Sequence, residues 1–169
     1  MKETAIHLRA LEPEDLDMLY QIENNRELWS VGVTNVPYSR YILQEYIATQ
    51  KGDIYADRQV RLMIEDSEVE CVGIADIINF EPQHMRAEVG IVIIDDKRRQ
   101  GYALEALRQL QEYAISTLHL HQLYAYVDVD NAPSLMLFKK AGYSRQAVLG
   151  EWLYDGRNFH DVVLMQLFL

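Results

Sequence analysis

Hydrophobic and polar residues alternate, or apolar residues cluster in short runs, along several stretches of this chain. In the first of these stretches, Ile6, Leu8 and Ala10 alternate with His7 and Arg9, which is the period of a half-buried β-strand. Near the C-terminus an Asp-Gly pair separates two such stretches, which is a signal for a hairpin turn. The predicted strands lie within residues 5–11, 58–66, 69–80, 86–94 and 122–130, with a final hairpin in 145–169 around Asp155-Gly156.

Four other stretches have the spacing of amphipathic helices. The clearest has one apolar stripe with charged residues elsewhere, and the stripe consists of Leu104, Leu107, Leu110, Ala114 and Leu118. A second helix is predicted to bury Tyr41, Ile42, Tyr46 and Ile47. The predicted helices lie within residues 12–25, 36–50, 101–119 and 131–143, with an irregular link over 25–37.

The order of these elements is β-α-α-β-β-β-α-β-α-β-β, which combines hairpin-like neighbours with one βαβ crossover. It predicts a mixed α/β (α+β) fold with a mostly antiparallel seven-stranded sheet and about four flanking helices. No repeat or flexible linker interrupts the chain, so residues 1–169 are interpreted as a single domain.

Composition and charge narrow the classes of partner. The formal net charge of −10 disfavours nucleic acid and is compatible with a cationic substrate, although solubility alone also explains it. No signal peptide or membrane-spanning apolar run is apparent, so we expect a cytoplasmic protein without a membrane partner. Cys71 is the one cysteine and fits a small buried position. His119 and His121 lack a third ligand nearby in sequence, so no metal site is expected.

One short motif suggests chemistry. After the strand-like residues 86–94, three basic residues, Lys97 to Arg99, precede Gly101 and the start of the clearest helix. Unpaired N–H groups at a helix start, next to a residue without a side chain, can hold an anion. The glycine spacing matches neither a Walker loop nor a dinucleotide-binding fingerprint. Taken alone, the motif fits equally an ordinary helix start with solvated arginines.

A wider context extends this motif. The segments "RAEVGIVIIDDKRRQGYALEAL" and "LYAYVDVDNAPSLMLFKKAGY" resemble the acyl-CoA-binding half of the GNAT superfamily of N-acetyltransferases. The family's (Gln/Arg)-x-x-Gly-x-(Gly/Ala) loop matches Arg98, Gly101 and Ala103. Within the superfamily the chain looks most similar to spermidine N-acetyltransferases and to the Rim-type acetyltransferases of ribosomal protein N-termini.

The resemblance implies acetyl-CoA as a cosubstrate and assigns its binding residues. Main-chain N–H groups at the helix start would bind the diphosphate of coenzyme A, a nearby strand would pair with its pantetheine arm, and the helix after Asn131 would close the other side. The implied cofactor-binding residues are Ile91, Val92, Ile93, Arg98, Arg99, Gln100, Gly101, Tyr102, Ala103, Leu104, Asn131, Ser134, Phe138 and Lys140. The resemblance also implies that the two strands flanking this site separate.

The resemblance places two catalytic candidates. Glu88 occupies the position of a family glutamate and would deprotonate the amine, although it could equally be a solvated residue or a partner of Arg86. Spermidine-type enzymes have a tyrosine acid where this chain has Phe138, which cannot donate a proton. Ser134 matches a serine of the Rim-type enzymes and would relay a proton, or alternatively contact the cofactor or cap the helix. Tyr143 is interpreted as a packing residue.

The amine acceptor is less defined by the sequence. A diamine or polyamine such as spermidine, a protein N-terminus, or loss of catalysis in a CoA-binding sensor are the alternatives. The loop "SVGVTNVPY" lacks the acidic residues of spermidine-type proteins, which leaves Glu23 and Glu27 as candidate cation partners. By analogy with similar proteins we expect a homodimer. Four aromatic residues could line an acceptor pocket but are interpreted as core: Trp29, Tyr38, Tyr41 and Trp152.

Overall fold

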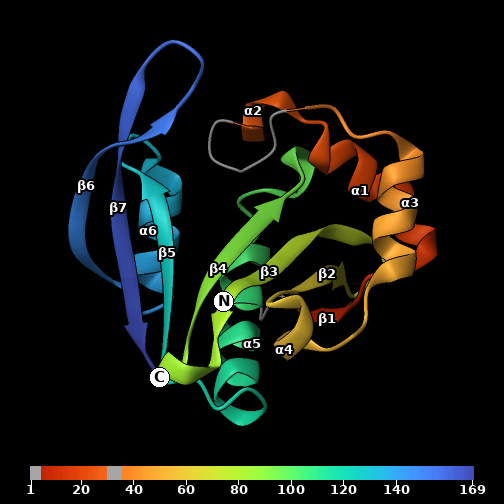
Figure 1. Ribbon diagram of the computed structural model, residues 1–169, viewed down its shortest axis with the longest axis horizontal. Coiled ribbons are helices and arrows are strands. Elements are labelled where there is room, and N and C mark those ends of the chain that lie inside the picture. The colour runs from red at the N-terminus through yellow and green to blue at the C-terminus, as the bar shows by residue number, and fades with distance from the viewer. Residues whose placement is uncertain (1–4, 30–35) are drawn as a thin grey trace.

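The computed structural model describes residues 5–29 and 36–169 and contains a seven-stranded sheet with helices on both faces (Figure 1). The strand order is β1-β2-β3-β4-β5-β7-β6, and all neighbours are antiparallel except β4 and β5. The strands are β1 (Ile6–Ala10), β2 (Val60–Asp66), β3 (Cys71–Glu81), β4 (Arg86–Ile93), β5 (Gln122–Asp128), β6 (Ser144–Tyr154) and β7 (Phe159–Phe168). The predicted mixed, mostly antiparallel sheet is therefore confirmed.

The four predicted helices are present, together with two single-turn helices, α2 and α4, that were not predicted. Four residues are too few to show a helical period in the sequence. The helices are α1 (Leu16–Glu23), α2 (Arg26–Trp29), α3 (Arg40–Thr49), α4 (Ile54–Asp57), α5 (Tyr102–Ser116) and α6 (Ala132–Lys140), and the 3-10 turns are η1 (Pro13–Asp15), η2 (Pro82–His84) and η3 (Asp95–Lys97). The link over 25–37 was predicted to be irregular, which is wrong for residues 26–29.

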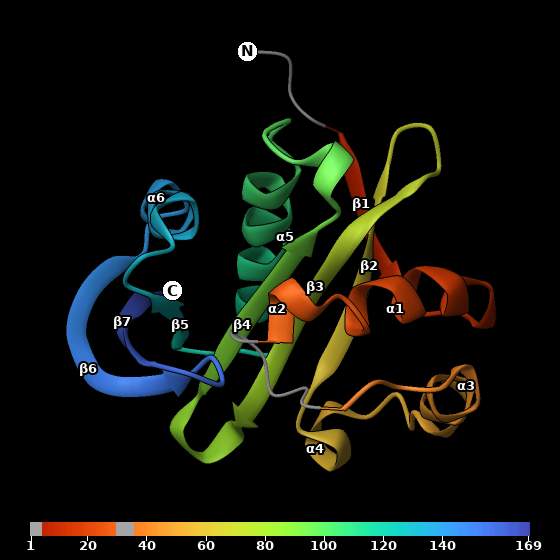
Figure 2. The ribbon, with the colours of Figure 1, turned by 90° about the horizontal axis from the view of Figure 1, so that it is seen from above.

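Helices cover the two faces of the sheet from opposite sides (Figure 2). On one face, Leu19 of α1 and Leu43 of α3 pack with Met63 and Ile74 of the sheet. On the other face, the predicted stripe of α5 is buried together with residues of β3, β4, β5 and Phe138 of α6. Because side chains alternate along a strand, residues such as Glu88, Tyr124 and Tyr126 project toward the face that α1 and α3 cover.

The predicted apolar face of α3 is partly wrong. Leu43 is the buried residue of this helix, and Tyr46 and Ile47 pack beside it. Tyr41 and Ile42 are exposed, because the stripe that contacts the sheet follows residues 43, 46 and 47 at helical spacing. Tyr41 instead donates a hydrogen bond to Glu45 on the outer surface (2.8 Å).

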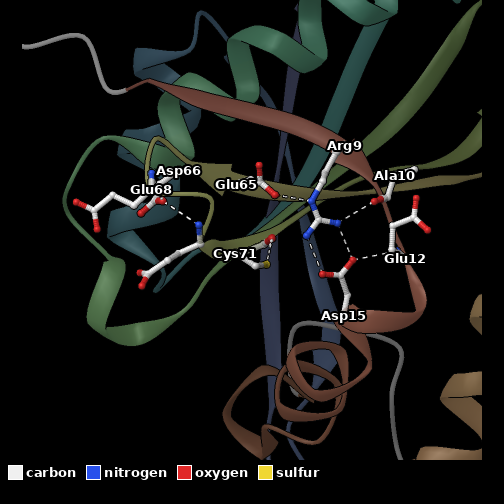
Figure 3. A network of polar contacts seen from close by, with 10 residues as sticks. Arg9, Ala10, Glu12, Asp15, Glu65, Asp66, Glu68 and Cys71 are labelled. Carbon is white, nitrogen blue, oxygen red and sulfur yellow. Dashed lines mark hydrogen bonds and ion pairs between the residues drawn. The ribbon is translucent and has the colours of Figure 1, made fainter.

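A buried ion pair connects β1 to the start of α1 (Figure 3). The Arg9 guanidinium donates to both carboxylate oxygens of Asp15 (2.7 and 2.8 Å) and to Glu65 of β2 (2.7 Å). Asp15 also accepts from the Glu12 backbone N–H (2.9 Å). Burial alone would raise the pKa of Asp15, but these hydrogen bonds outweigh it and the pKa is lowered. The pair therefore fixes the angle at which α1 leaves the sheet.

Cys71, at the start of β3, is partly buried beside this network, close to the position predicted for it (Figure 3). Burial raises the pKa of its thiol. Within the described ranges, no helix has both the length and the apolar character needed to cross a membrane.

Candidate active site

The candidate site lies where β4 and β5 part. These strands pair only through Arg86↔Gln122, Ala87↔Leu123 and Glu88↔Tyr124. Beyond Glu88 both strands continue but diverge, and Figure 1 shows β4 and β5 moving apart toward the top of the view. In residues 89–93, β4 remains paired with β3, so every second residue directs its N–H and C=O toward the gap instead. The expected separation of the two strands is therefore present, and it leaves main-chain groups available to a ligand.

Glu88 is the last residue of β4 that pairs with β5 before these two strands diverge. Its Oε2 accepts a hydrogen bond from Asn79 Nδ2 (2.8 Å). Asn79 lies where the register between β3 and β4 shifts, and its φ of 49° turns it out of the regular strand. Arg86 pairs with Glu81 instead of Glu88. Among the described residues Glu88 therefore has a hydrogen-bond donor but forms no ion pair.

Burial raises the pKa of Glu88, and the hydrogen bond from Asn79 only partly offsets this effect. A carboxylate with a raised pKa is a stronger base, so this environment suits proton abstraction near neutral pH. Across the strand pair, burial and the Glu88 carboxylate raise the pKa of Tyr124 to about 12. Tyr124 therefore keeps its hydroxyl proton next to the glutamate.

The predicted anion site begins at Gly101, which caps α5 with a φ of 94°. This left-handed conformation strongly favours glycine, and no side chain caps the helix there. The first intrahelical bond runs from the Glu105 N–H to the Gly101 carbonyl (3.1 Å). The N–H groups of residues 102–104 precede it and have no acceptor within the helix, as expected for a first turn. The backbone here has the form that an anion site requires.

The three basic residues before Gly101 have different environments. Lys97 pairs with Asp66 and Glu70, and Arg98 donates to the Ile93 carbonyl (3.0 Å) and pairs with Asp95. Arg99 is exposed and forms no ion pair with any residue in the described ranges. Gln100 is exposed and donates to the Asp96 carbonyl (3.1 Å). Of the three cations, Arg99 is therefore the one whose charge is available to a ligand without breaking a described contact.

The start of α6 lies beyond the end of β5. Asn131 caps this helix by accepting from the Ser134 backbone N–H (3.1 Å), so the Ser134 hydroxyl is not the cap. Phe138 is 4% exposed and packs edge-to-face on Tyr143 (5.0 Å between ring centroids). Tyr143 is 2% exposed, which agrees with the packing role predicted for it. Lys140 is exposed in the last turn. Ser134 is half-buried in the first turn of α6.

A serine substitution separates the roles considered for this residue. In Ser134→Ala the cap from Asn131 to the backbone is retained, so we expect the melting temperature to stay within about 1 °C, as for a surface change. If the hydroxyl relays a proton to the leaving thiolate, kcat falls by about tenfold while the Michaelis constants change little. Asn131→Ala is the control, because it removes the cap and lowers stability by about 1 kcal/mol. An unchanged kcat in Ser134→Ala would remove the relay role.

The four aromatic residues interpreted as core divide into two groups. Tyr38 packs against the cluster under α1, and the partly buried Trp29 donates its indole N–H to the Glu23 carbonyl (2.9 Å). Tyr41 and Trp152 are exposed, so the core interpretation is wrong for both. Trp152 instead contacts Tyr126 (5.7 Å between centroids), which contacts Tyr124 (5.7 Å). An aromatic row therefore extends from the parting of the strands to β6, and sequence spacing did not indicate it.

The candidate cation partners are only partly available. Glu23 pairs with Arg61, which also binds Asp76 through two hydrogen bonds (2.8 Å each). Glu27 is exposed on α2. The acid-poor loop over residues 30–38 lies mostly outside the described residues. His119 and His121 precede β5, and the His121 ring contacts the Phe168 ring at a tilt of 53°. A separate group of possible metal ligands, Asp128, Asp130 and His160, has ligand atoms within 4.8 Å of one another.

Comparison with known proteins identifies the family. The model of the acetyltransferase (GNAT) domain matches residues 5–144. The chain belongs to the GNAT acetyltransferase family. It is therefore an acetyl-CoA-dependent N-acetyltransferase, which confirms the predicted class of enzyme.

This acetyltransferase is similar in sequence and in structure to a bacterial spermidine acetyltransferase. Spermidine N(1)-acetyltransferase of Vibrio cholerae is 26% identical over 160 residues, covering 95% of this chain and 91% of the relative. A crystal structure of the Vibrio cholerae enzyme with CoA and spermine has a TM-score of 0.85 at 27% identity, covering 96% and 95% of the two chains. A dodecameric structure of that enzyme has a TM-score of 0.80 at 25% identity, covering 96% and 93%. The fold of this acetyltransferase is thus that of the family.

Proposed function

We propose that this acetyltransferase acetylates a primary amine of a small polycation, a diamine or polyamine such as spermidine. One observation carries the proposal: the Glu88 carboxylate lies at one end of a row formed by Tyr124, Tyr126 and the exposed Trp152. Aromatic faces and a carboxylate together attract alkylammonium groups. Similarity to spermidine enzymes along nearly the whole chain supports the same acceptor class.

In the proposed mechanism Glu88 accepts a proton from the bound ammonium group, because only a neutral amine can attack. An alkylammonium with a pKa of about 10.4 is less than about 0.1% neutral at pH 7, so this step is needed. Bound acetyl-CoA supplies the thioester carbon that the amine attacks. A main-chain N–H of residues 89–93 would donate to the developing oxyanion. As the C–S bond breaks, the attacking nitrogen loses a second proton, and Ser134 would pass a proton to the departing sulfur.

The proposed binding site for acetyl-CoA has three parts. The N–H groups of residues 99–104, next to Gly101, would hold the diphosphate, with Arg99 adding charge. The Arg98 N–H already donates to the Asp95 carbonyl (3.3 Å). Within Ile91, Val92 and Ile93, the backbone groups that alternate toward the gap would pair with the pantetheine arm. Asn131, Ser134 and the α6 helix to Lys140 would flank the opposite side, with Phe138 contributing apolar support. In this proposal acetyl-CoA lies along the gap between β4 and β5. The match of Arg98, Gly101 and Ala103 to the family motif supports the site.

An acceptor panel tests the proposal. Thiol release from acetyl-CoA is measured with spermidine, putrescine, an aminoglycoside and short peptides with the N-terminal sequences of ribosomal proteins. We expect kcat/KM for spermidine or putrescine to exceed that for any peptide by at least about tenfold. A preference for peptides would replace the polyamine proposal with N-terminal acetylation. Turnover with none of them would contradict the polyamine acceptor.

We also propose that residues 1–169 form one domain and that this domain self-associates, at least as a homodimer. The first and last strands belong to one sheet, which supports a single domain. The edge strand β6 and its hairpin partner β7 expose Val148, Trp152, Tyr154 and Phe159, an apolar surface typical of subunit contacts. Light scattering should give a mass of at least twice the 19.7 kDa of the chain. A monomeric mass at working concentration would contradict association.

A further inference from the structure

Lys97 is charged and lies in the loop that leads to the proposed diphosphate site, yet its charge is already engaged. Its ammonium group donates to Glu70 (2.7 Å) and to Asp66 (3.4 Å), and 22% of its side chain is exposed. Both carboxylates belong to the β2–β3 turn, which is 27 to 31 residues away in sequence. Lys97 therefore adds a side-chain link between the loop after β4 and the β2–β3 turn.

Asp66 is the fixed end of this link. One of its carboxylate oxygens accepts from the N–H groups of Glu68 (2.9 Å) and Glu70 (3.1 Å), which closes the turn (Figure 3). The other oxygen accepts from Lys97. The Asp66 side chain is 5% exposed. A buried carboxylate held by its own backbone is a rigid anchor, so a cation bound to it is also held in place.

The loop has two further attachments to the sheet. The Ile94 N–H donates to the Val72 carbonyl (3.0 Å), and the Arg98 guanidinium donates to the Ile93 carbonyl (3.0 Å). Both acceptors lie in strands, in β3 and β4, whereas Lys97 is the last residue of η3 and reaches the β2–β3 turn. After Arg98 the backbone has positive φ at two residues separated by Gln100, namely Arg99 (φ 63°) and Gly101 (φ 94°). Such a backbone keeps its shape only when the residues around it are fixed.

We propose that Lys97 is a positioning residue for acetyl-CoA: its bridge to Asp66 and Glu70 holds the loop before Gly101 in the shape that binds the diphosphate. This inference rests on the diphosphate site proposed above. Lys97 contributes to binding by ordering the loop in the unliganded protein, and it does not contact the phosphates itself. Preorganisation of this kind lowers the ordering entropy that a ligand must overcome.

Two substitutions distinguish this role from direct phosphate contact. Lys97→Ala should raise the KM and Kd for acetyl-CoA by about fivefold with kcat at saturation unchanged, as expected for loss of a partly buried ion pair. Glu70→Gln should also raise both constants, by about twofold. A direct phosphate ligand predicts the opposite sign for Glu70→Gln, because removing that carboxylate would release Lys97 toward the anion.

Three controls accompany these variants. Lys51→Ala makes the same change of net charge at an exposed site near α4 and should leave the KM for acetyl-CoA unchanged. Lys97→Arg keeps the charge and should restore binding to within about twofold. In the double variant Lys97→Ala/Glu70→Gln, the second substitution should add nothing to the first, because both remove one link. Melting temperatures without ligand report folding separately.

The outcomes separate the two proposals. If Lys97→Ala binds acetyl-CoA like Lys51→Ala, or if Glu70→Gln tightens binding, the positioning role is wrong. A Gly101→Val variant tests the diphosphate site itself. If that variant weakens binding and Lys97→Ala does not, only the positioning role fails. If Gly101→Val binds normally, the diphosphate site is wrong and the role of Lys97 falls with it.

Discussion

Glu88→Gln lowers kcat by about two to three orders of magnitude near pH 7, the effect expected when a general base is removed. Glutamine keeps the shape of the side chain and can still contact Asn79, so the fold should be retained. The amide cannot accept the proton of the ammonium group, and the amine must then react through its small neutral fraction. Steady-state thiol release at saturating acetyl-CoA measures the effect.

The effect of Glu88→Gln on kcat should depend on pH. Wild-type kcat should fall as pH decreases through the raised pKa of Glu88, because the protonated carboxyl cannot act as a base. As pH increases toward about 10, the amine becomes neutral without help, so the gap between wild type and Glu88→Gln should narrow. A constant ratio across this range would exclude Glu88 as the base.

Asn79→Gly provides a matched test of the same carboxylate. Glycine tolerates the left-handed φ of this position and removes the amide that donates to Glu88. Because that hydrogen bond lowers the pKa of Glu88, its loss should move the acidic limb of the pH profile to higher pH. The plateau rate should remain close to that of the wild type. A shift toward lower pH would contradict the environment inferred for Glu88.

Gly101→Val weakens acetyl-CoA binding by at least about tenfold, which corresponds to about 1.4 kcal/mol. The left-handed conformation at this position disfavours any residue with a Cβ by about 1–2 kcal/mol, and more for a β-branched one. Valine should therefore shift the loop and place a side chain at the helix start, where the diphosphate would lie. Calorimetric titration with acetyl-CoA measures the change in affinity.

Gly156→Val is the matched control. Gly156 has a nearly identical φ of 96°, but it lies in the β6–β7 turn with no atom within 4 Å of an added Cβ. Both variants suffer similar backbone strain, so both should lose stability. Only Gly101→Val should lose affinity for acetyl-CoA. Equal affinity in the two variants would refute the assignment of the helix start as the diphosphate site.

Much of the fold could be predicted because strong periodic patterns determine it. The α5 stripe, the strand alternation and the Asp155-Gly156 turn all correspond to observed elements. Gly101 could be selected because it lies just before an amphipathic run and matches the glycine of the family's loop motif. The exposure of Tyr41 and Trp152 could not be predicted, because an aromatic residue has the same pattern in a core as on a surface that contacts other aromatic side chains.

The polar contacts of the site were beyond sequence reasoning for a different reason. The hydrogen bond from Asn79 to Glu88 depends on an irregularity in β3, which has no periodic signature. The ion pairs of Lys97 could not be predicted because its partners, Asp66 and Glu70, are distant in the chain. Local sequence gives the charge of a residue, but only the tertiary fold determines which opposite charge it meets.

The divergence of β4 from β5 also bears on how such proteins change over evolutionary time. The edge of β4 that faces the gap presents backbone N–H and C=O groups to a ligand. These groups are chemically the same whatever amino acid carries them. Substitutions in this part of β4 change the side chains beside the gap but leave the backbone donors and acceptors intact. A scaffold of this kind can diverge to about a quarter identity, as seen with the Vibrio cholerae relative, while the fold is retained.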